Sequence, residues 1–239
     1  MDTNTFNNLI SQTWPDLHAA STLGGGTFGT VYACTKTDAV TGVTQKEAVK
    51  VVRVDFTPED RANAEEEGIP FADYYRAVKE KRLQEIRWMV ALKSPHIVHI
   101  NGYTAIEEPD HSALYILIRM DCLTALDQLR PAHLDDTPEQ AAALAEKVAL
   151  DICDALRVCH QNGVLHRDIK PANILCSDAG DFYLGDFGIS KGTAQQASMT
   201  SSGTLEYAPR EVMTGQYDHR ADLYSLGLVL YALAVSYTH

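Results

Sequence analysis

The sequence predicts an α+β protein in which a small antiparallel sheet precedes a mainly helical region. Two segments in the first half, Glu47–Val54 and Leu114–Ile118, are rich in the branched and apolar residues that are typical of buried strands. In the second half, Thr137 to Gln140 form a capping box with proline at the first helical position. An apolar stripe continues from there to Gln161, which indicates a long helix.

The first strand pair is expected around a glycine-rich turn, which runs from Leu23 to Tyr32. Strand-like residues follow the turn, whereas a dinucleotide-binding loop would lead into a helix, so the pattern indicates a hairpin. Gly24, Gly26 and Gly29 carry no Cβ, so backbone N–H groups can approach a phosphate closely. A glycine-rich turn alone is weak evidence, because an ordinary hairpin shows the same composition.

After the strand that contains Lys50, residues 55–73 carry seven acidic residues and one basic residue. Pro58, Gly68 and Pro70 interrupt this stretch, so we expect a solvated loop. A helix is then expected from Asp73 to Leu92, because apolar and charged residues recur on one face at helical spacing.

Composition limits the possible functions. The net charge of −12 disfavours a nucleic-acid partner. The five cysteines are scattered without C-x-x-C spacing, which indicates reduced thiols in a cytoplasmic protein rather than disulfides or a zinc site.

The N-terminal residues lack the features of a signal peptide. The apolar run Leu223–Val235 has 13 residues, too few to span a bilayer, so we expect a buried helix there and no membrane segment in this chain.

The most informative stretch is His166-Arg167-Asp168-Ile169-Lys170-Pro171-Ala172-Asn173. Asp186-Phe187-Gly188 begins 18 residues after Asp168. The glycine-rich turn precedes this stretch, and Gly203-Thr204-Leu205-Glu206-Tyr207 follows it. These segments stand in the order of the protein kinase signatures. The chain therefore resembles a eukaryotic-type Ser/Thr protein kinase, from about Trp14 almost to its end.

The resemblance implies a bilobal kinase fold, with a small antiparallel β-sheet lobe and a mainly helical large lobe. We expect a leader at 1–13, the small lobe at 14–120 and the large lobe at 121–239. The large lobe is expected to be incomplete, because a full kinase continues through several more helices. The pattern also departs from the family at Ala208-Pro209-Arg210-Glu211, where the proline is shifted by one position from the usual A-P-E.

The resemblance also implies ATP and Mg²⁺ as cofactors and a protein Ser/Thr hydroxyl as acceptor. Asp168 would be the catalytic base, and Lys170 would offset charge on the transferred phosphate. Asn173 and Asp186 would supply oxygen ligands to Mg²⁺. Asp222 would hold the backbone of the catalytic loop. The expected ATP-binding residues are Gly24, Gly26, Gly29, Val31, Ala48, Lys50, Ile118 and Glu85, which would orient Lys50, with Glu80 as the alternative to Glu85.

The Ser/Thr-rich segment between Ile189 and Tyr207 is the expected activation loop. Arg167 could pair with a phosphate on that loop. Thr200, Ser201 and Ser202 are the candidate phosphorylation sites, and they lie next to Thr204 of the G-T-x-x-Y segment.

Two alternatives to an active protein kinase remain open on the sequence. One is a catalytically impaired fragment or pseudokinase-like binding module. The other is a small-molecule phosphotransferase, which shares the catalytic and metal-binding Asp residues but lacks the remaining motifs.

Overall fold

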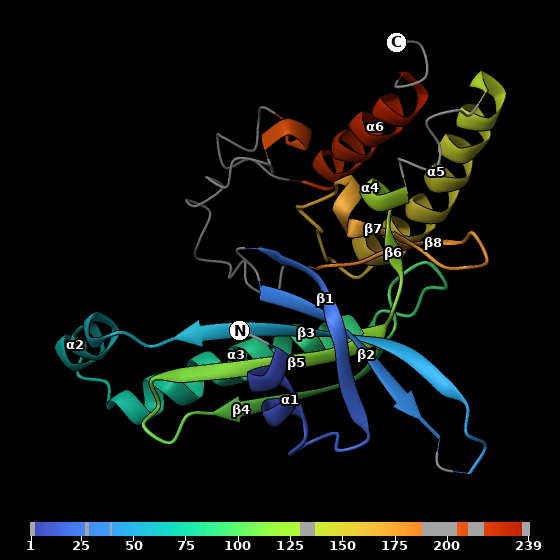
Figure 1. Ribbon diagram of the computed structural model, residues 1–239. Helices are drawn as coiled ribbons and strands as arrows, with labels where there is room; N and C mark the ends of the chain where they lie inside the picture. The colour runs from blue at the N-terminus through green and yellow to red at the C-terminus, as the bar shows by residue number, and fades with distance from the viewer. Residues whose placement is uncertain are drawn as a thin grey trace. The chain divides into compact units, whose positions relative to one another are not determined.

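A computed structural model describes residues 3–26, 29–38, 40–129, 137–187, 205–209 and 218–235. The chain forms two compact units. The first comprises Met1–Val90 and His99–Cys122, and the second comprises Ala91–Val98 and Leu123–His239. The fold class is α+β, as the sequence predicts: the first unit holds a five-stranded sheet together with helices, and the second holds two long helices with a smaller sheet (Figure 1).

The first unit is built on a five-stranded antiparallel sheet with the order β1-β2-β3-β5-β4. Its central strands β3 and β5 contain the two segments that the sequence predicts as strands. Six successive residues of β3, from Glu47 to Val52, are buried, as expected for a central strand. The strands are β1 (Leu17–Gly26), β2 (Gly29–Thr37), β3 (Thr44–Asp55), β4 (Ile100–Glu107) and β5 (Ala113–Asp121).

The glycine-rich turn joins β1 to β2, which confirms the predicted hairpin. Gly29 opens β2 with φ +123°, a backbone conformation that side chains disfavour. A Cβ at this position would lie 2.2 Å from the carbonyl oxygen of Val51. Glycine is therefore required here by both conformation and space.

Helix α1 (Thr3–Ile10) packs into the core of the sheet unit. The Phe6 ring stacks on Tyr32 with centroids 3.9 Å apart, and Phe6 and Ile10 are fully buried. The Asn7 side-chain oxygen accepts a hydrogen bond from the Ala19 N–H at 2.9 Å. The segment that the sequence assigns to a leader thus contributes side chains to the core.

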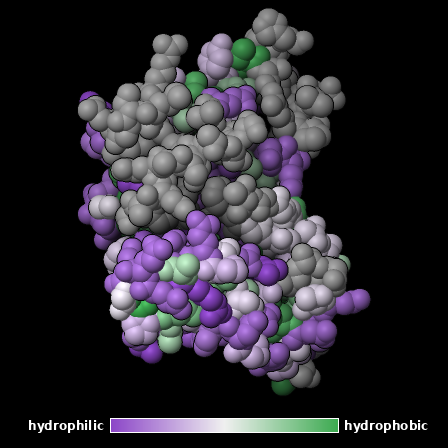
Figure 2. All heavy atoms as spheres, turned by 90° about the vertical axis from the view of Figure 1, so that its left-hand side faces the viewer, coloured by the Kyte–Doolittle hydropathy of each residue, from purple (hydrophilic) through white to green (hydrophobic). Residues whose placement is uncertain are grey.

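The expectation of an irregular loop at 55–73 is wrong, because Pro58–Glu66 forms helix α2. Thr57 is the N-cap and exchanges hydrogen bonds with Asp60 in a capping box, while Pro58 occupies the first turn. Proline at this position starts a helix rather than breaking one. On the side of the sheet unit that carries α2, most of the coloured surface is hydrophilic (lower part of Figure 2), which fits the acidic composition of this helix.

Helix α3 (Phe71–Ala91) confirms the helix that the sequence predicts after this segment. Its first turns join an aromatic cluster, in which Phe56 lies 4.6 Å from Tyr75 between ring centroids. Arg61 of α2 stacks over the Phe71 ring at 3.9 Å, so α2 and the start of α3 are held together.

The second unit contains two long helices, α5 (Pro138–Gln161) and α6 (His219–Val235), which pack side by side (Figure 1). The Thr137 capping box opens α5 as predicted, and α5 ends at its C-cap, Asn162, which Gly163 follows with φ +71°. A small sheet of order β6-β7-β8 lies in the same unit. The shorter elements are β6 (Thr124–Ala125), α4 (Leu126–Leu129), the 3₁₀ helix η2 (Pro171–Asn173), β7 (Ile174–Cys176), β8 (Phe182–Leu184) and the 3₁₀ helix η3 (Leu205–Tyr207).

Within the described part of the chain, no helix has both the length and the apolar character needed to cross a membrane. All five cysteines are free thiols, and burial raises the pKa of Cys34 and Cys159 to about 12. Both buried thiols are therefore held in their neutral form and serve as apolar core groups.

The packing of α1 yields the first prediction. Phe6→Ala removes a fully buried ring that stacks on Tyr32, so we expect a loss of about 3–5 kcal/mol in the free energy of unfolding. Chemical denaturation followed by circular dichroism measures this loss. Asn4→Ala, on the exposed side of the same helix, is the control and should change stability by less than about 0.5 kcal/mol. Equal stability of the two variants would contradict the packing of α1.

Candidate active site

Within the sheet unit, four of the predicted ATP-binding residues form one row across four strands. Gly24 of β1 pairs with Val31 of β2, Val31 pairs with Lys50 of β3, and Lys50 pairs with Ile118 of β5. Directly opposed residues share a face of the sheet, and so do residues two positions apart on a strand. Ala48 therefore lies on the same face as Lys50.

Lys50 is the charged member of this row and is only 6% exposed. Its neighbours across the strands are apolar, and Ile118 and Ala48 are both buried. A buried ammonium group is costly unless it meets negative charge. Gly26 ends β1 and pairs with Gly29, the first residue of β2, and neither residue carries a Cβ.

Two glutamates of α3 are candidates to orient Lys50. Glu85 lies on the more buried side of the helix, with its side chain 19% exposed and 3.3 Å from Arg82. Burial raises the pKa of Glu85, and the nearby Arg82 partly offsets this effect. Glu80 is exposed and forms an ion pair with Arg87. The burial of Glu85 favours it over Glu80 as the partner, and the assignment stays a prediction.

In the second unit, the segment that follows α5 and includes η2 brings Lys170 and Asn173 against Asp168. The Asp168 carboxyl is buried, and its Oδ2 lies 3.1 Å from the Lys170 ammonium. The Asn173 amide nitrogen donates to the Asp168 carbonyl at 2.7 Å and to the same Oδ2 at 3.1 Å. These contacts fix a carboxylate, an ammonium and an amide within one short turn of the chain.

The amide contacts also orient the Asn173 side chain. Because its nitrogen makes both hydrogen bonds to Asp168, its carbonyl oxygen is the end that remains for another ligand. The Asn173 backbone carbonyl accepts from the Gly185 N–H at 2.9 Å. This bond ties the loop to the residue that directly precedes Asp186.

His166 joins the same loop to the Asp186 segment from the other side. Its Nε2 lies 2.8 Å from the Gly185 carbonyl, which can only accept, so Nε2 carries the proton. Its Nδ1 then accepts from the Asp168 N–H at 3.3 Å. Burial lowers the pKa of His166 despite the opposing effect of the Gly185 carbonyl and the Asp222 charge. The neutral ring satisfies both contacts, so this histidine acts as a structural bridge.

Asp222 of α6 holds the backbone of this loop, as the sequence predicts. Its fully buried carboxylate accepts the N–H of His166 at 2.9 Å and that of Arg167 at 2.8 Å. The His160 ring of α5 approaches the same carboxylate at 2.9 Å through Nε2. One buried carboxylate thus connects both long helices to the loop that carries Asp168.

Two residues of the site adopt left-handed backbone conformations that are uncommon for non-glycine residues. Arg167 has φ 64° and Asp186 has φ 50°. Each such conformation costs about 1–3 kcal/mol and persists only where surrounding contacts impose it. Backbone strain of this kind clusters at functional sites, which supports a functional role for this loop.

The donor set fits a hard divalent cation. Asn173 offers an amide oxygen and Asp186 a carboxylate, and such cations prefer oxygen ligands. The described residues hold no group of three or more His, Cys, Asp or Glu that could enclose a metal by themselves. A cation that binds through one or two carboxylates together with ligand phosphates does not need such a group.

Several predicted residues lie outside the described part of the chain. They are Gly188 of the Asp-Phe-Gly segment, Glu211 of the shifted A-P-E segment, and the regulatory positions Thr200, Ser201, Ser202 and Thr204.

The fold and the geometry of this loop are those of the protein kinase class. A family model described as Protein kinase domain matches residues 17–238, so the chain belongs to the protein kinase family. Members of this family use ATP together with a divalent metal.

The chain is similar to curated Ser/Thr kinases and Aurora kinases. It is 35% identical over 159 residues to Aurora kinase B of Drosophila melanogaster, which covers 66% of the chain and 46% of the relative. It is 34% identical over 221 residues to the serine/threonine-protein kinase PknJ of Mycobacterium tuberculosis, covering 88% of the chain and 32% of the relative. It is 35% identical over 158 residues to PknB of Mycobacterium leprae, covering 63% and 24%. The chain therefore spans less than half the length of these relatives.

Sequence reasoning missed two contributors to the geometry of the site. Gly185 is enclosed so tightly that a Cβ would lie 3.0 Å from Leu175 and 3.3 Å from Val98. Asp151 of α5 is a buried carboxylate bonded to β8, which the helical stripe did not distinguish from an ordinary polar residue. The glycine directly before Asp-Phe-Gly is the one signal in the sequence that could have pointed to this close packing.

The contacts of Asp222 yield the second prediction. Asp222→Ala leaves two buried backbone N–H groups and a ring nitrogen without their acceptor, so we expect a loss of about 3–5 kcal/mol in the free energy of unfolding. Thermal or denaturant unfolding measures it. Asp218→Ala, in the exposed residue just before α6, is the control and should cost about 1 kcal/mol. A loss no larger than that of the control would contradict the bridging role of Asp222.

Proposed function

We propose that this chain is an ATP-dependent kinase domain that transfers the γ-phosphate of ATP to serine or threonine hydroxyls of protein substrates. The observation that carries the proposal is the fixed cluster of Asp168, Lys170 and Asn173, with Asp186 tied to it through Gly185. Phosphoryl transfer needs positioned groups and charge stabilisation more than covalent chemistry by the protein, and this cluster offers both.

In the proposed reaction, the substrate hydroxyl gives its proton to Asp168 as its oxygen bonds to the γ-phosphorus. The bond between that phosphorus and the bridging oxygen of ADP breaks, and ADP leaves. Lys170, 3.1 Å from Asp168, would stabilise the negative charge on the transferred group. Asn173 and Asp186 would hold Mg²⁺, which neutralises phosphate charge when bound.

In the sheet unit, Lys50 would contact the phosphates of ATP, with Glu85 orienting it. Gly24, Gly26 and Gly29 would place backbone N–H groups against the phosphates. The apolar residues Val31, Ala48 and Ile118 share the face of Lys50 and would contact the adenine ring. Their placement on one face of the sheet supports this assignment.

The acceptor and the cellular location belong to the same proposal. The lysine in Asp168-Ile169-Lys170 and the Gly203-Thr204 pair favour Ser/Thr over tyrosine as the acceptor. The net charge of −12 argues against a nucleic-acid partner. The five free cysteines suit a reducing cytoplasm.

The role of Asp168 yields the third prediction. Asp168→Ala should lower phosphate transfer from radiolabelled ATP by about 10²–10⁴-fold, because it removes the group that receives the hydroxyl proton. Asp178→Ala, an exposed residue in the turn between β7 and β8, is the control and should retain wild-type activity.

The acceptors in that assay separate the alternatives. Transfer to Ser/Thr peptides but not to aminoglycosides supports a protein kinase, and the reverse supports a small-molecule phosphotransferase. Equal labelling by the wild type and Asp168→Ala would favour a binding module without activity.

The activation loop yields the fourth prediction. In active protein, we expect phosphate on at least one of Thr200, Ser201 and Ser202, because Arg167 beside the catalytic Asp could pair with it. Mass spectrometry of the purified protein measures this. The Asp168→Ala protein, incubated alone with ATP, shows whether the chain modifies itself. Active protein with all three residues unmodified would refute the prediction.

A further inference from the structure

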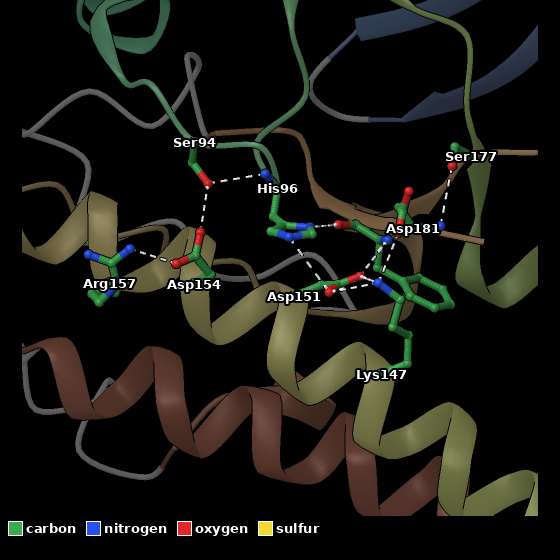
Figure 3. Close-up of polar contacts among 9 residues, drawn as sticks. Ser94, His96, Lys147, Asp151, Asp154, Arg157, Ser177 and Asp181 are labelled. Atoms are coloured by element: carbon green, nitrogen blue, oxygen red, sulfur yellow. Dashed lines mark hydrogen bonds and ion pairs between the residues drawn. The ribbon is translucent and has the colours of Figure 1, made fainter. Parts of the chain in front are cut away.

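A cluster of side chains outside the proposed catalytic set clamps the first residue of β8 (Figure 3). Both backbone polar groups of Phe182 are held by side chains. The Asp151 carboxylate of α5 accepts the Phe182 N–H at 2.9 Å. The His96 ring contacts the Phe182 carbonyl through Nδ1 at 3.0 Å. A carbonyl can only accept, so this contact assigns a proton to Nδ1.

Asp151 is almost fully buried, and the positive charge of Lys147 compensates its carboxylate. The Lys147 ammonium, one turn earlier on α5, approaches its two oxygens at 3.0 and 2.7 Å and also contacts Asp181 at 2.9 Å. The carboxylates of Asp151 and Asp181 raise the pKa of Lys147, and Lys147 in turn lowers the pKa of Asp181. The His96 Nε2 lies 3.7 Å from the Oδ1 atom of Asp151. The clamp is therefore a compensated charge network and not an isolated buried ion.

The backbone continues the clamp along β8. The Leu184 N–H donates to the His96 carbonyl at 2.8 Å, and the Val98 N–H donates to the Leu184 carbonyl at 3.0 Å. The opposite edge of β8 pairs with β7. Strand β8 is thus fixed by α5 at its first residue, by residues 96–98 on one edge and by β7 on the other.

The fixed strand leads directly to the metal-binding segment. Gly185 follows the last residue of β8 and is bonded to both Asn173 and His166. Asp186 comes next and has the strained φ of 50°. A strained residue keeps a constant position only if the strand before it is fixed. The clamp at Phe182 fixes β8 and therefore helps to set the position of the Asp186 carboxylate.

We infer that Asp151, assisted by His96, is a positioning residue for phosphoryl transfer, which acts through β8 to set the place of Asp186. The inference rests on the proposed function, in which Asp186 is a metal ligand. Asp151 touches neither substrate nor metal in this role. Residues that orient metal ligands from behind typically change metal affinity about 10–100-fold when they are replaced.

The experiment uses the full chain and three variants of α5. Asp151→Ala removes the acceptor of the Phe182 N–H, and Asp151→Asn keeps an acceptor oxygen but removes the charge. Asp154→Asn is the control, because Asp154 lies one turn further on the same helix, pairs with Arg157 and Ser94, and makes no bond to β8 (Figure 3).

Two readouts separate positioning from plain stability. The first is the dissociation constant of a fluorescent ATP analogue as a function of Mg²⁺ concentration. We expect Asp151→Ala to raise the Mg²⁺ concentration for half-maximal binding about 10-fold, Asp151→Asn to raise it less, and Asp154→Asn to leave it unchanged. The second is hydrogen exchange of the Phe182 and Leu184 amides without metal, which should accelerate in Asp151→Ala and stay unchanged in Asp154→Asn.

A lower melting temperature with wild-type Mg²⁺ dependence in both Asp151 variants would overturn the inference and leave Asp151 with a structural role only. Asp186→Asn provides the reference for the proposed function. If Asp186→Asn leaves the Mg²⁺ dependence unchanged, the metal assignment fails, whereas an effect of Asp186→Asn without one of Asp151→Ala refutes the positioning role alone. If Asp151→Ala does not fold, the Asn variant decides by the same criterion.

Discussion

The buried carboxylate of Asp222 is the interaction on which the candidate site depends. A carboxylate without solvent is costly unless several donors compensate it, and here two backbone N–H groups and an imidazole do so. In return, the polar loop that carries Asp168 is held in a fixed place between α5 and α6 by direct hydrogen bonds. The backbone of the loop is therefore held rigid around Asp168, whose carboxyl is itself buried.

That rigidity explains why the strained conformations persist. The Arg167 N–H itself donates to Asp222, and Asp186 follows a glycine whose N–H and C=O are both bonded. Each left-handed residue costs about 1–3 kcal/mol, which the surrounding hydrogen bonds offset. A Cβ on Gly185 would lie 3.0 Å from Leu175 and 3.3 Å from Val98, so a larger residue there would have to displace these side chains. Conformation, packing and polar contacts thus determine one geometry.

The sequence predicted the parts of the fold that carry local signals. The Thr137 capping box, the hairpin at Gly29 and the apolar strands β3 and β5 all follow from residue type and spacing. Helix α2 was missed although Thr57 to Asp60 forms a similar cap, because its polar residues lack the apolar period that indicates a packed helix. Helix α1 was missed because only Phe6 and Ile10 carry its packing, and their partner Tyr32 is remote in sequence.

The same distinction applies within the site. The motif spacing predicts Asp168, Lys170, Asn173 and Asp186 as site residues, since the proposed chemistry constrains those residue types along the chain. It could not locate Asp151, because the Phe182 N–H that this carboxylate accepts lies 31 residues away and a backbone donor leaves no mark on the sequence. Asp222 and Asp151 act in the same way: each is a carboxylate on a helix that accepts hydrogen bonds from backbone N–H groups of a neighbouring segment. One fixes the segment before Asp168, and the other fixes the strand before Asp186. Gly185, bonded to both His166 and Asn173, joins the two fixed segments. A buried acidic residue on a helix beside a catalytic loop is therefore better interpreted from its backbone partners than from its distance to the reacting atoms.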